Sequence, residues 1–257
     1  HPAAGDDDVA ARSDNEMQNV AGGAALSTKS GGTGIGLAVA LNIVSGLDTD
    51  ATVGANADVS ATGSVDVSAH AQVTPKSETL PVVGTVGVTS FAAGAAGSSS
   101  GNAVGGSSSV NVFLVNTGAS IGANAQVSAG DGIAVTADDT IEIFGAAGGL
   151  AASTGNAGVG IAIDVGVLTR HTVATVGAGA DLQAGDDVSV TATSHDDITS
   201  IAGTFGLSTS GTGVAGSIAV QVVTTETRAE LLDSSSTSVT AGGDVHVAAT
   251  GTLCAFA

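Results

Sequence analysis

The chain has 257 residues, of which 43% are hydrophobic, and its 24 acidic residues against five Lys and Arg give a net charge of −19. Such a surface repels nucleic acid and anionic membranes, so neither is an expected partner. Aromatic residues amount to 2%, and Trp and Tyr are absent, so Val, Ile, Leu and Ala must fill the interior. Thirty-nine glycines with only three prolines favour tight turns, and a core without large rings suits a narrow, regular cross-section.

The N-terminal segment 1–19 is polar and acidic, and it is interpreted as an extended arm, a cap or an intersubunit strand. The rest of the chain, 20–257, is interpreted as one domain of four tandem repeats. The predicted repeats are 20–88, 89–142, 143–199 and 200–257. The longest apolar run, 34–47, is too short for a transmembrane helix, so no membrane insertion is expected. Because the chain starts at His1 and not at Met, it fits a mature secreted subunit or a fragment of a larger protein.

One phrase marks every repeat. It reads A-D-V-S-A-T-G-S-V-D-V-S-A in 57–69 and returns, with substitutions, in 125–137, 180–192 and 236–249. Its central alanines, 68, 55 and 57 residues apart in turn, are Ala61, Ala129, Ala184 and Ala241. The longer first interval indicates a loop inserted at 73–85, a segment that holds two of the three prolines.

Two further blocks recur in the same order in every repeat. A block of small residues occupies 21–28, 91–98, 145–154 and 201–209, and an alternating block follows in 34–44, 108–115, 158–168 and 215–223. In the alternating block, Val, Ile and Leu take every second position, which is the pattern of a strand with one buried face. No stretch has sustained helical spacing with caps, so the chain is predicted to be all-β.

The preferred fold is a β-solenoid, a right-handed parallel β-helix in which each repeat makes two to three coils of roughly twenty residues. The recurring phrase is expected to form a corner, where Ala-Gly-Asp bends the chain and the flanking V-x-V segments point inward on adjacent faces. A β-sandwich is the structural alternative, but it gives no reason for a fourfold repeat.

The positions between the aliphatic residues of the alternating block are mostly Gly, Ala and Ser, and these are expected to face outward. A flat face of small residues can lie close against another sheet and drive lateral assembly. The candidate assembly residues are Gly160, Ala162, Gly166 and Ala219, together with Cys254 and Phe256 in the uncharged C-terminal segment. The single cysteine excludes a disulfide within the chain and leaves a buried thiol or an intermolecular bond.

Paired acids are the only candidates for a metal site. Calcium takes carboxylate oxygens, and the pairs considered are Asp138 with Asp139 and Asp186 with Asp187. The nonapeptide repeat of calcium-binding β-rolls is absent, and acids are also common in solvated β-corners. No cofactor is therefore expected, with calcium kept as an alternative.

The phrase A-x-V-x-A-G-x-x-V-x-V-x-A, combined with the small-residue and alternating blocks, resembles the repeats of large bacterial secreted adhesins and haemagglutinin-like surface proteins. The resemblance covers residues 21–249. It implies export, display at the cell surface and adhesive or filament-forming roles, and it supplies no catalytic residues.

Three functions remain open, in order of preference. The first is a structural, non-enzymatic protein that self-associates as a subunit or segment of an extracellular filament, sheath or adhesin stalk. The second is a surface adhesin that binds a ligand through the insertion at 73–85 or through a terminal cap. The third is a β-helix enzyme acting on polysaccharides, which the scarcity of Lys, Arg and aromatic residues disfavours.

Overall fold

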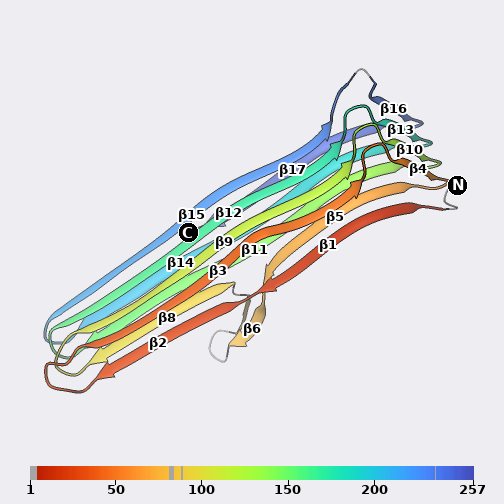
Figure 1. The fold of residues 1–257 in the computed structure, drawn as a ribbon. Helices are drawn as coiled ribbons and strands as arrows, with labels where there is room; N and C mark the ends of the chain where they lie inside the picture. The colour runs from red at the N-terminus through yellow and green to blue at the C-terminus, as the bar shows by residue number, and fades with distance from the viewer. Residues whose placement is uncertain (1–4, 81–83, 88, 235) are drawn as a thin grey trace.

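The structure, a computed structural model, describes residues 5–80, 84–87, 89–234 and 236–257. All of its regular elements are strands, and three stacks of parallel strands form one elongated slab (Figure 1). The predicted all-β solenoid of parallel strands is confirmed. A helix long and apolar enough to cross a membrane is not found in the described part of the chain.

Three sheets run the length of the stack, and we call them A, B and C. Sheet A contains the short strands β4 (Asp58–Ala61), β10 (Gln126–Ala129), β13 (Asp181–Ala184) and β16 (Ser238–Ala241). Sheet C contains β3 (Gly34–Val53), β9 (Ala103–Ile121), β12 (Ala157–Val176) and β15 (Thr212–Leu231). Sheet B contains β1 (Asp7–Met17), β2 (Asn19–Ser27), β5 (Val65–Pro75), β8 (Ser90–Ser98), β11 (Ile133–Ser153), β14 (Val188–Ser208) and β17 (Val245–Phe256).

Each repeat makes one coil, which passes through sheets C, A and B in turn. Val104 pairs with Val159 and Val159 with Val214, so neighbouring strands of sheet C are offset by 55 residues, which is the interval between repeats. The expectation of two to three shorter coils per repeat is therefore wrong. The reason is strand length: β11 and β14 run for 21 residues without a turn, where a typical strand has about five or six.

The N-terminal segment joins the stack. Strand β1 pairs with β5 in parallel register, from Asp7 with Val65 to Met17 with Pro75, and forms the outer strand of sheet B. The segment predicted as an arm or cap is thus a strand over 7–17, while residues 1–4 lie outside the described residues.

A hairpin interrupts sheet B between β5 and β8. Strands β6 (Ser77–Leu80) and β7 (Gly84–Gly87) pair antiparallel and project from the edge of the slab (Figure 1). The register of sheet B stops at Val73 with Ile141 and resumes at Ser90 with Gly145. The predicted insertion at 73–85 overlaps this hairpin, although residues 81–83 lie outside the described residues.

The slab has a wide half, where sheet A separates sheets B and C, and a thin half, where B and C face each other directly. In the wide half, alternating Val, Ile and Leu side chains point inward from all three sheets and form the larger apolar core, for example Ile121, Leu182 and Val190. The predicted corner, with V-x-V segments pointing inward on adjacent faces, is confirmed there.

The thin half has the opposite orientation. Along β3, Gly34, Gly36, Ala38 and Ala40 are buried, and the aliphatic residues between them are exposed. The two sheets touch through their backbones: a Cβ added to Gly36 would lie 1.8 Å from the carbonyl oxygen of Ala95. Sheets ordinarily pack about 10 Å apart because side chains fill the space between them. Here only glycine and alanine fit inside, so the expectation that they face outward is wrong.

Candidate functional site

A buried ionic cluster lies inside the slab, between the wide-half core and a second apolar core around Phe113 and Ile198. Arg170 on β12 donates a hydrogen bond of 2.7 Å from Nη1 to Asp196 Oδ1 on β14. Asp139 on β11 accepts a hydrogen bond of 3.0 Å from Thr117 Oγ1 on β9. Sheets B and C thus each supply one side of the cluster, and the strand alternation points all four side chains inward.

The cluster holds two carboxyl groups and one guanidinium. Burial raises the pKa of Asp139 to about 6, although the charge of Arg170 and the hydrogen bond from Thr117 act in the opposite direction. Burial also raises the pKa of Asp196, again against the charge of Arg170. Polar atoms of all three residues have no hydrogen-bond partner among the described residues: Asp139 Oδ1, Arg170 Nε and Asp196 Oδ2. Because one positive charge cannot neutralise two buried carboxylates, a proton on Asp139 balances the cluster.

This cluster is sealed from solvent. The side chains of Arg170 and Asp196 are 1% and 0% exposed, and Asp139 is equally buried. A catalytic acid or base must reach its substrate within hydrogen-bond distance, which a sealed position does not allow. The cluster therefore acts on the stability of the coil and on its response to pH.

A second buried polar row lies where the thin half begins. Asp164 on β12 accepts a hydrogen bond from Ser200, and burial raises the pKa of its carboxyl group. Ser90 and Ser109 share a hydrogen bond of 2.7 Å, and Asn42 donates one of 3.0 Å to Asn111. These side chains join sheets B and C across the interior where the spacing between the sheets changes.

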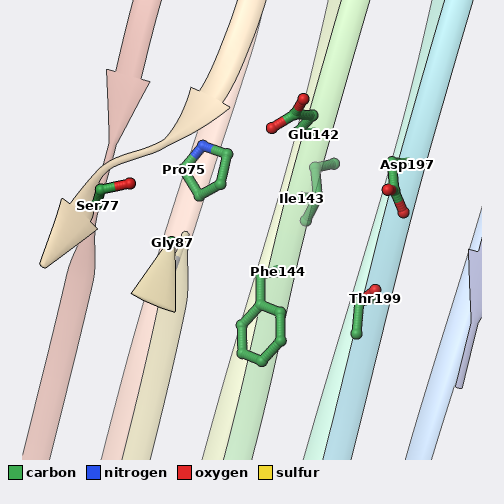
Figure 2. Close-up of a pocket in the computed structure, with 8 residues that line it drawn as sticks. All are labelled: Pro75, Ser77, Gly87, Glu142, Ile143, Phe144, Asp197 and Thr199. Atoms are coloured by element: carbon green, nitrogen blue, oxygen red, sulfur yellow. The ribbon is translucent and has the colours of Figure 1, made fainter. Parts of the chain in front are cut away.

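The most concave part of the surface near the inserted hairpin is a shallow depression of about 320 Å³ on sheet B (Figure 2). It is lined by Pro75, Ser77, Gly87, Glu142, Ile143, Phe144, Asp197 and Thr199. Glu142 and Asp197 are register partners on β11 and β14, so the two exposed carboxylates stand side by side. Next along the same strands, Phe144 pairs with Thr199 and gives the depression an apolar floor.

The outer face of sheet C in the thin half is aliphatic, and we call it the aliphatic face. Its positions on β3 are Ile35, Leu37, Val39, Leu41 and Ile43. Their register partners on the next three strands are Val104, Gly106, Ser108, Val110, Val112, Val159, Ile161, Ile163, Val165, Val167, Val214, Gly216, Ile218, Val220 and Val222. No charged residue occupies any of these positions.

The predicted assembly residues lie in different environments. Gly160, Ala162 and Gly166 are buried on the inner side of β12 and do not form an outer surface. Ala219 is half-buried on β15. The two C-terminal candidates, Cys254 and Phe256, are exposed on β17, and the cysteine is a free thiol, not the buried one that was favoured.

The predicted calcium pairs do not converge. Asp138 points outward and lies 3.0 Å from His70 Nδ1, whereas Asp139 points inward, because neighbours on a strand face opposite sides. Asp186 and Asp187 lie in the turn between β13 and β14, where Asp187 Oδ1 accepts a hydrogen bond of 2.7 Å from the backbone of Asp244. Within the described residues, no group of three or more His, Cys, Asp or Glu is placed to hold a metal ion.

Sequence reasoning missed both the ionic cluster and the aliphatic face. The signal for the cluster was Arg170 at an inward position of its strand, two residues beyond Leu168 and two before Thr172. The signal for the aliphatic face was that glycine and alanine alternate with large residues only in the segment that follows the small-residue block. Neither a protein-family model, nor a curated protein, nor a solved structure matches the chain.

Proposed function

We propose that this protein is a structural, non-enzymatic segment of an extracellular surface assembly, such as a filament, sheath or adhesin stalk. The observation that carries the proposal is the constant coil. From β9 to β15, every residue of sheet C keeps the same partner offset, so each coil has the same cross-section and the stack extends along one axis. Such a solenoid gains length by adding coils, because each coil contacts only its neighbours.

The distribution of ionisable groups supports a structural role. The described carboxyl groups with raised pKa values include Asp139, Asp164 and Asp196, which are buried inside the slab, where they face each other, Arg170 and serine or threonine hydroxyls. Perturbed carboxyl groups in an open cleft would favour an enzyme. Here the interior uses them to hold sheets B and C together.

The experiment is electron microscopy of the purified chain combined with fibre diffraction. We expect elongated particles whose axial repeat is about 4.8 Å, the spacing between stacked strands. Particle length should increase with protein concentration, because the outer strands of each sheet present backbone groups that another strand can pair. Compact particles that stay monomeric at every salt and protein concentration would contradict the proposal.

A ligand-binding adhesin module is the second candidate, and the depression beside the hairpin favours it. Paired carboxylates from Glu142 and Asp197 above an aromatic floor from Phe144 suit a ligand that combines a cationic or hydroxyl group with an apolar body. The test compares cell or glycan binding by the intact chain and by the double variant Glu142→Gln and Asp197→Asn. Binding that is lost in the variant supports this candidate, and binding that is unchanged removes the depression as its site.

A further inference from the structure

We propose that two copies of this chain pair through the aliphatic face, related by a two-fold axis that runs parallel to the strands between β9 and β12. The inference rests on the proposed structural function and specifies the partner: a second copy of the same solenoid. Three observations carry it: the absence of charge on the face, the alternation of large and small residues across it, and its area.

The aliphatic face is uncharged in a protein with a net charge of −19. Its eleven strongly exposed aliphatic side chains are between 38% and 66% exposed. They are Ile35, Leu37, Val39, Leu41, Ile43, Ile161, Ile163, Val214, Ile218, Val220 and Val222. On the same outer face, charged residues begin only in the wide half, at Asp48 on β3 and Glu226 on β15. Water therefore meets a continuous apolar surface, which soluble proteins ordinarily cover.

The face alternates between large and small residues across one row of register partners. The row runs Leu37, Gly106, Ile161 and Gly216 on β3, β9, β12 and β15. Two apolar depressions follow from it. One, of about 220 Å³, lies over Gly106 between Leu37 and Ile161, and the other, of about 330 Å³, lies over Gly216 and is lined by Ile161 and Ile218. Ridges therefore lie on β3 and β12, and hollows lie on β9 and β15.

This pattern is complementary to itself under one symmetry. A two-fold axis along the strands reverses the order of strands in the second copy, so β3 faces β15 of the partner and β9 faces β12. Leu37 then lies over the Gly216 hollow of the other copy, and Ile161 lies over the Gly106 hollow. An axis perpendicular to the strands would place ridge on ridge, with Leu37 facing itself. A two-fold contact needs a self-complementary patch, and only the first arrangement provides it.

The area suits a stable pair. Four strands about 4.8 Å apart and nine residues of about 3.3 Å each give a projected rectangle of about 570 Å². The accessible area is larger than this projection, because the side chains form ridges and hollows, so it approaches the roughly 800 Å² per partner of stable interfaces. The same geometry keeps the acidic wide halves side by side and outside the contact.

The charge distribution favours a second copy over a lipid surface. An acidic protein is repelled from anionic headgroups, and the aliphatic face lies on the same slab as the acidic wide half. Its mirror-related counterpart on another copy carries no charge and needs no headgroup. Vesicle binding is therefore an outcome that the experiment must distinguish from pairing.

The test uses Gly216→Val. A Cβ at Gly216 meets no atom within 4 Å, so the variant should fold as the native chain does, yet valine fills the hollow that Leu37 of the partner needs. The matched control is Gly203→Val on β14, which also has open space at its Cβ but lies on the outer face of sheet B. Ile218→Lys, which places a charge on the face, is the second variant.

Sedimentation equilibrium measures the dimer dissociation constant of each protein. We expect the native chain and Gly203→Val to form dimers of equal affinity. Gly216→Val should raise the dissociation constant at least tenfold, and Ile218→Lys should abolish pairing. A native chain that stays monomeric, or a Gly216→Val variant that pairs as tightly as the native chain, would overturn the proposal. Flotation of the native chain with phosphatidylcholine vesicles would also overturn it, in favour of lipid.

Microscopy separates this inference from the proposed function. Elongation along the solenoid axis uses the strand edges, whereas pairing uses the aliphatic face. Gly216→Val should therefore give filaments half as wide as those of the native chain. Native filaments of single width would leave the structural function standing and reject the pairing, and the loss of all filaments in the native chain would reject the function first.

Discussion

Arg170 and Asp196 form a 2.7 Å hydrogen-bonded ion pair in which neither side chain is more than 1% exposed. The pair joins β12 of sheet C to β14 of sheet B across the interior of the slab. Asp139 lies in the same cluster, and its carboxyl group is influenced by both charges. The slab is thus divided along its strands into two apolar cores with a charged cluster between them.

Replacing Arg170 by Met should destabilise the protein by about 3–5 kcal/mol. The substitution keeps the length of the side chain but leaves Asp196 buried without its positive partner, which costs more than the pair itself contributes. The measurement is urea denaturation at pH 7 followed by far-ultraviolet circular dichroism.

The matched control is Arg228→Met on the same face-alternating sheet. Arg228 is half exposed and pairs with Glu226 and Glu230 at 3.0 and 2.9 Å on the surface. Exposed ion pairs contribute less than about 1 kcal/mol, so this variant should unfold nearly as the native chain does. Equal losses in both variants would show that the buried cluster has no special role.

The stability of the protein should fall as the pH rises from about 4 to about 6. Burial raises the pKa of Asp139 to about 6 from a model value of 3.8, so the folded state binds a proton that the unfolded chain releases in this interval. A change of about two pKa units corresponds to about 3 kcal/mol, which is present below pH 4 and lost above pH 6. The raised pKa values of Asp164 and Asp196 act in the same direction.

Asp139→Asn isolates this effect. The amide cannot ionise and can still accept the hydrogen bond from Thr117, so the variant should match the native chain near pH 4 and exceed its stability at pH 7. Asp138→Asn is the neighbouring control, because Asp138 points outward toward His70. Denaturation midpoints measured from pH 4 to 7 decide the matter: a native-like slope in Asp139→Asn would place the proton elsewhere.

The all-β class, the fourfold repeat and the corner of the wide half followed from the sequence because period-two alternation and recurring Ala-Gly turns are local signals. The orientation of the thin half did not follow. Alternation of Leu37 with Gly36 and Ala38 identifies a strand but not which side faces inward. The usual rule buries the larger residue, and here the separation of the two sheets, a tertiary property, reverses it.

The coil length and the ionic cluster were beyond local reasoning for related reasons. A strand of 21 residues contains several windows that each look like a complete strand, so the number of coils per repeat was overestimated. Asp139 was interpreted as one half of a surface pair with Asp138, because acidic neighbours are typical of turns. Its burial depends on Arg170, which lies 31 positions further along the sequence and on the opposite sheet.

The thin half should not tolerate side chains on its inner face. In Gly94→Val, the added Cβ would lie 1.9 Å from the carbonyl oxygen of Gly106 and 2.8 Å from that of Gly36, and both are backbone atoms of sheet C. We expect a loss of about 3 kcal/mol or more, since the sheets must separate. Gly22→Val on β2, where a Cβ meets nothing within 4 Å, should change stability by less than about 1 kcal/mol.

Hydrogen exchange gives the spatial readout for that pair of variants. Amides of β8 and β9 should lose protection in Gly94→Val, whereas those of the wide half should keep it, because the wide-half core does not depend on the thin half for its apolar contacts. Native protection across β8 in Gly94→Val would contradict the close backbone contact of the two sheets.

Removing the hairpin should preserve the solenoid. The offset is 68 residues from Val65 to Ile133 and 55 from Ile133 to Val188, a difference of 13, which equals the length of the segment 77–89. Joining Lys76 directly to Ser90 restores the spacing of β11, in which Ile141 and Gly145 occupy the positions of Val73 and Ser90. We expect unchanged circular dichroism and unchanged assembly, because closing a shorter loop costs less entropy. If the deleted chain fails to fold under conditions where the native chain folds, the hairpin supports sheet B, and the constant 55-residue coil is not sufficient by itself.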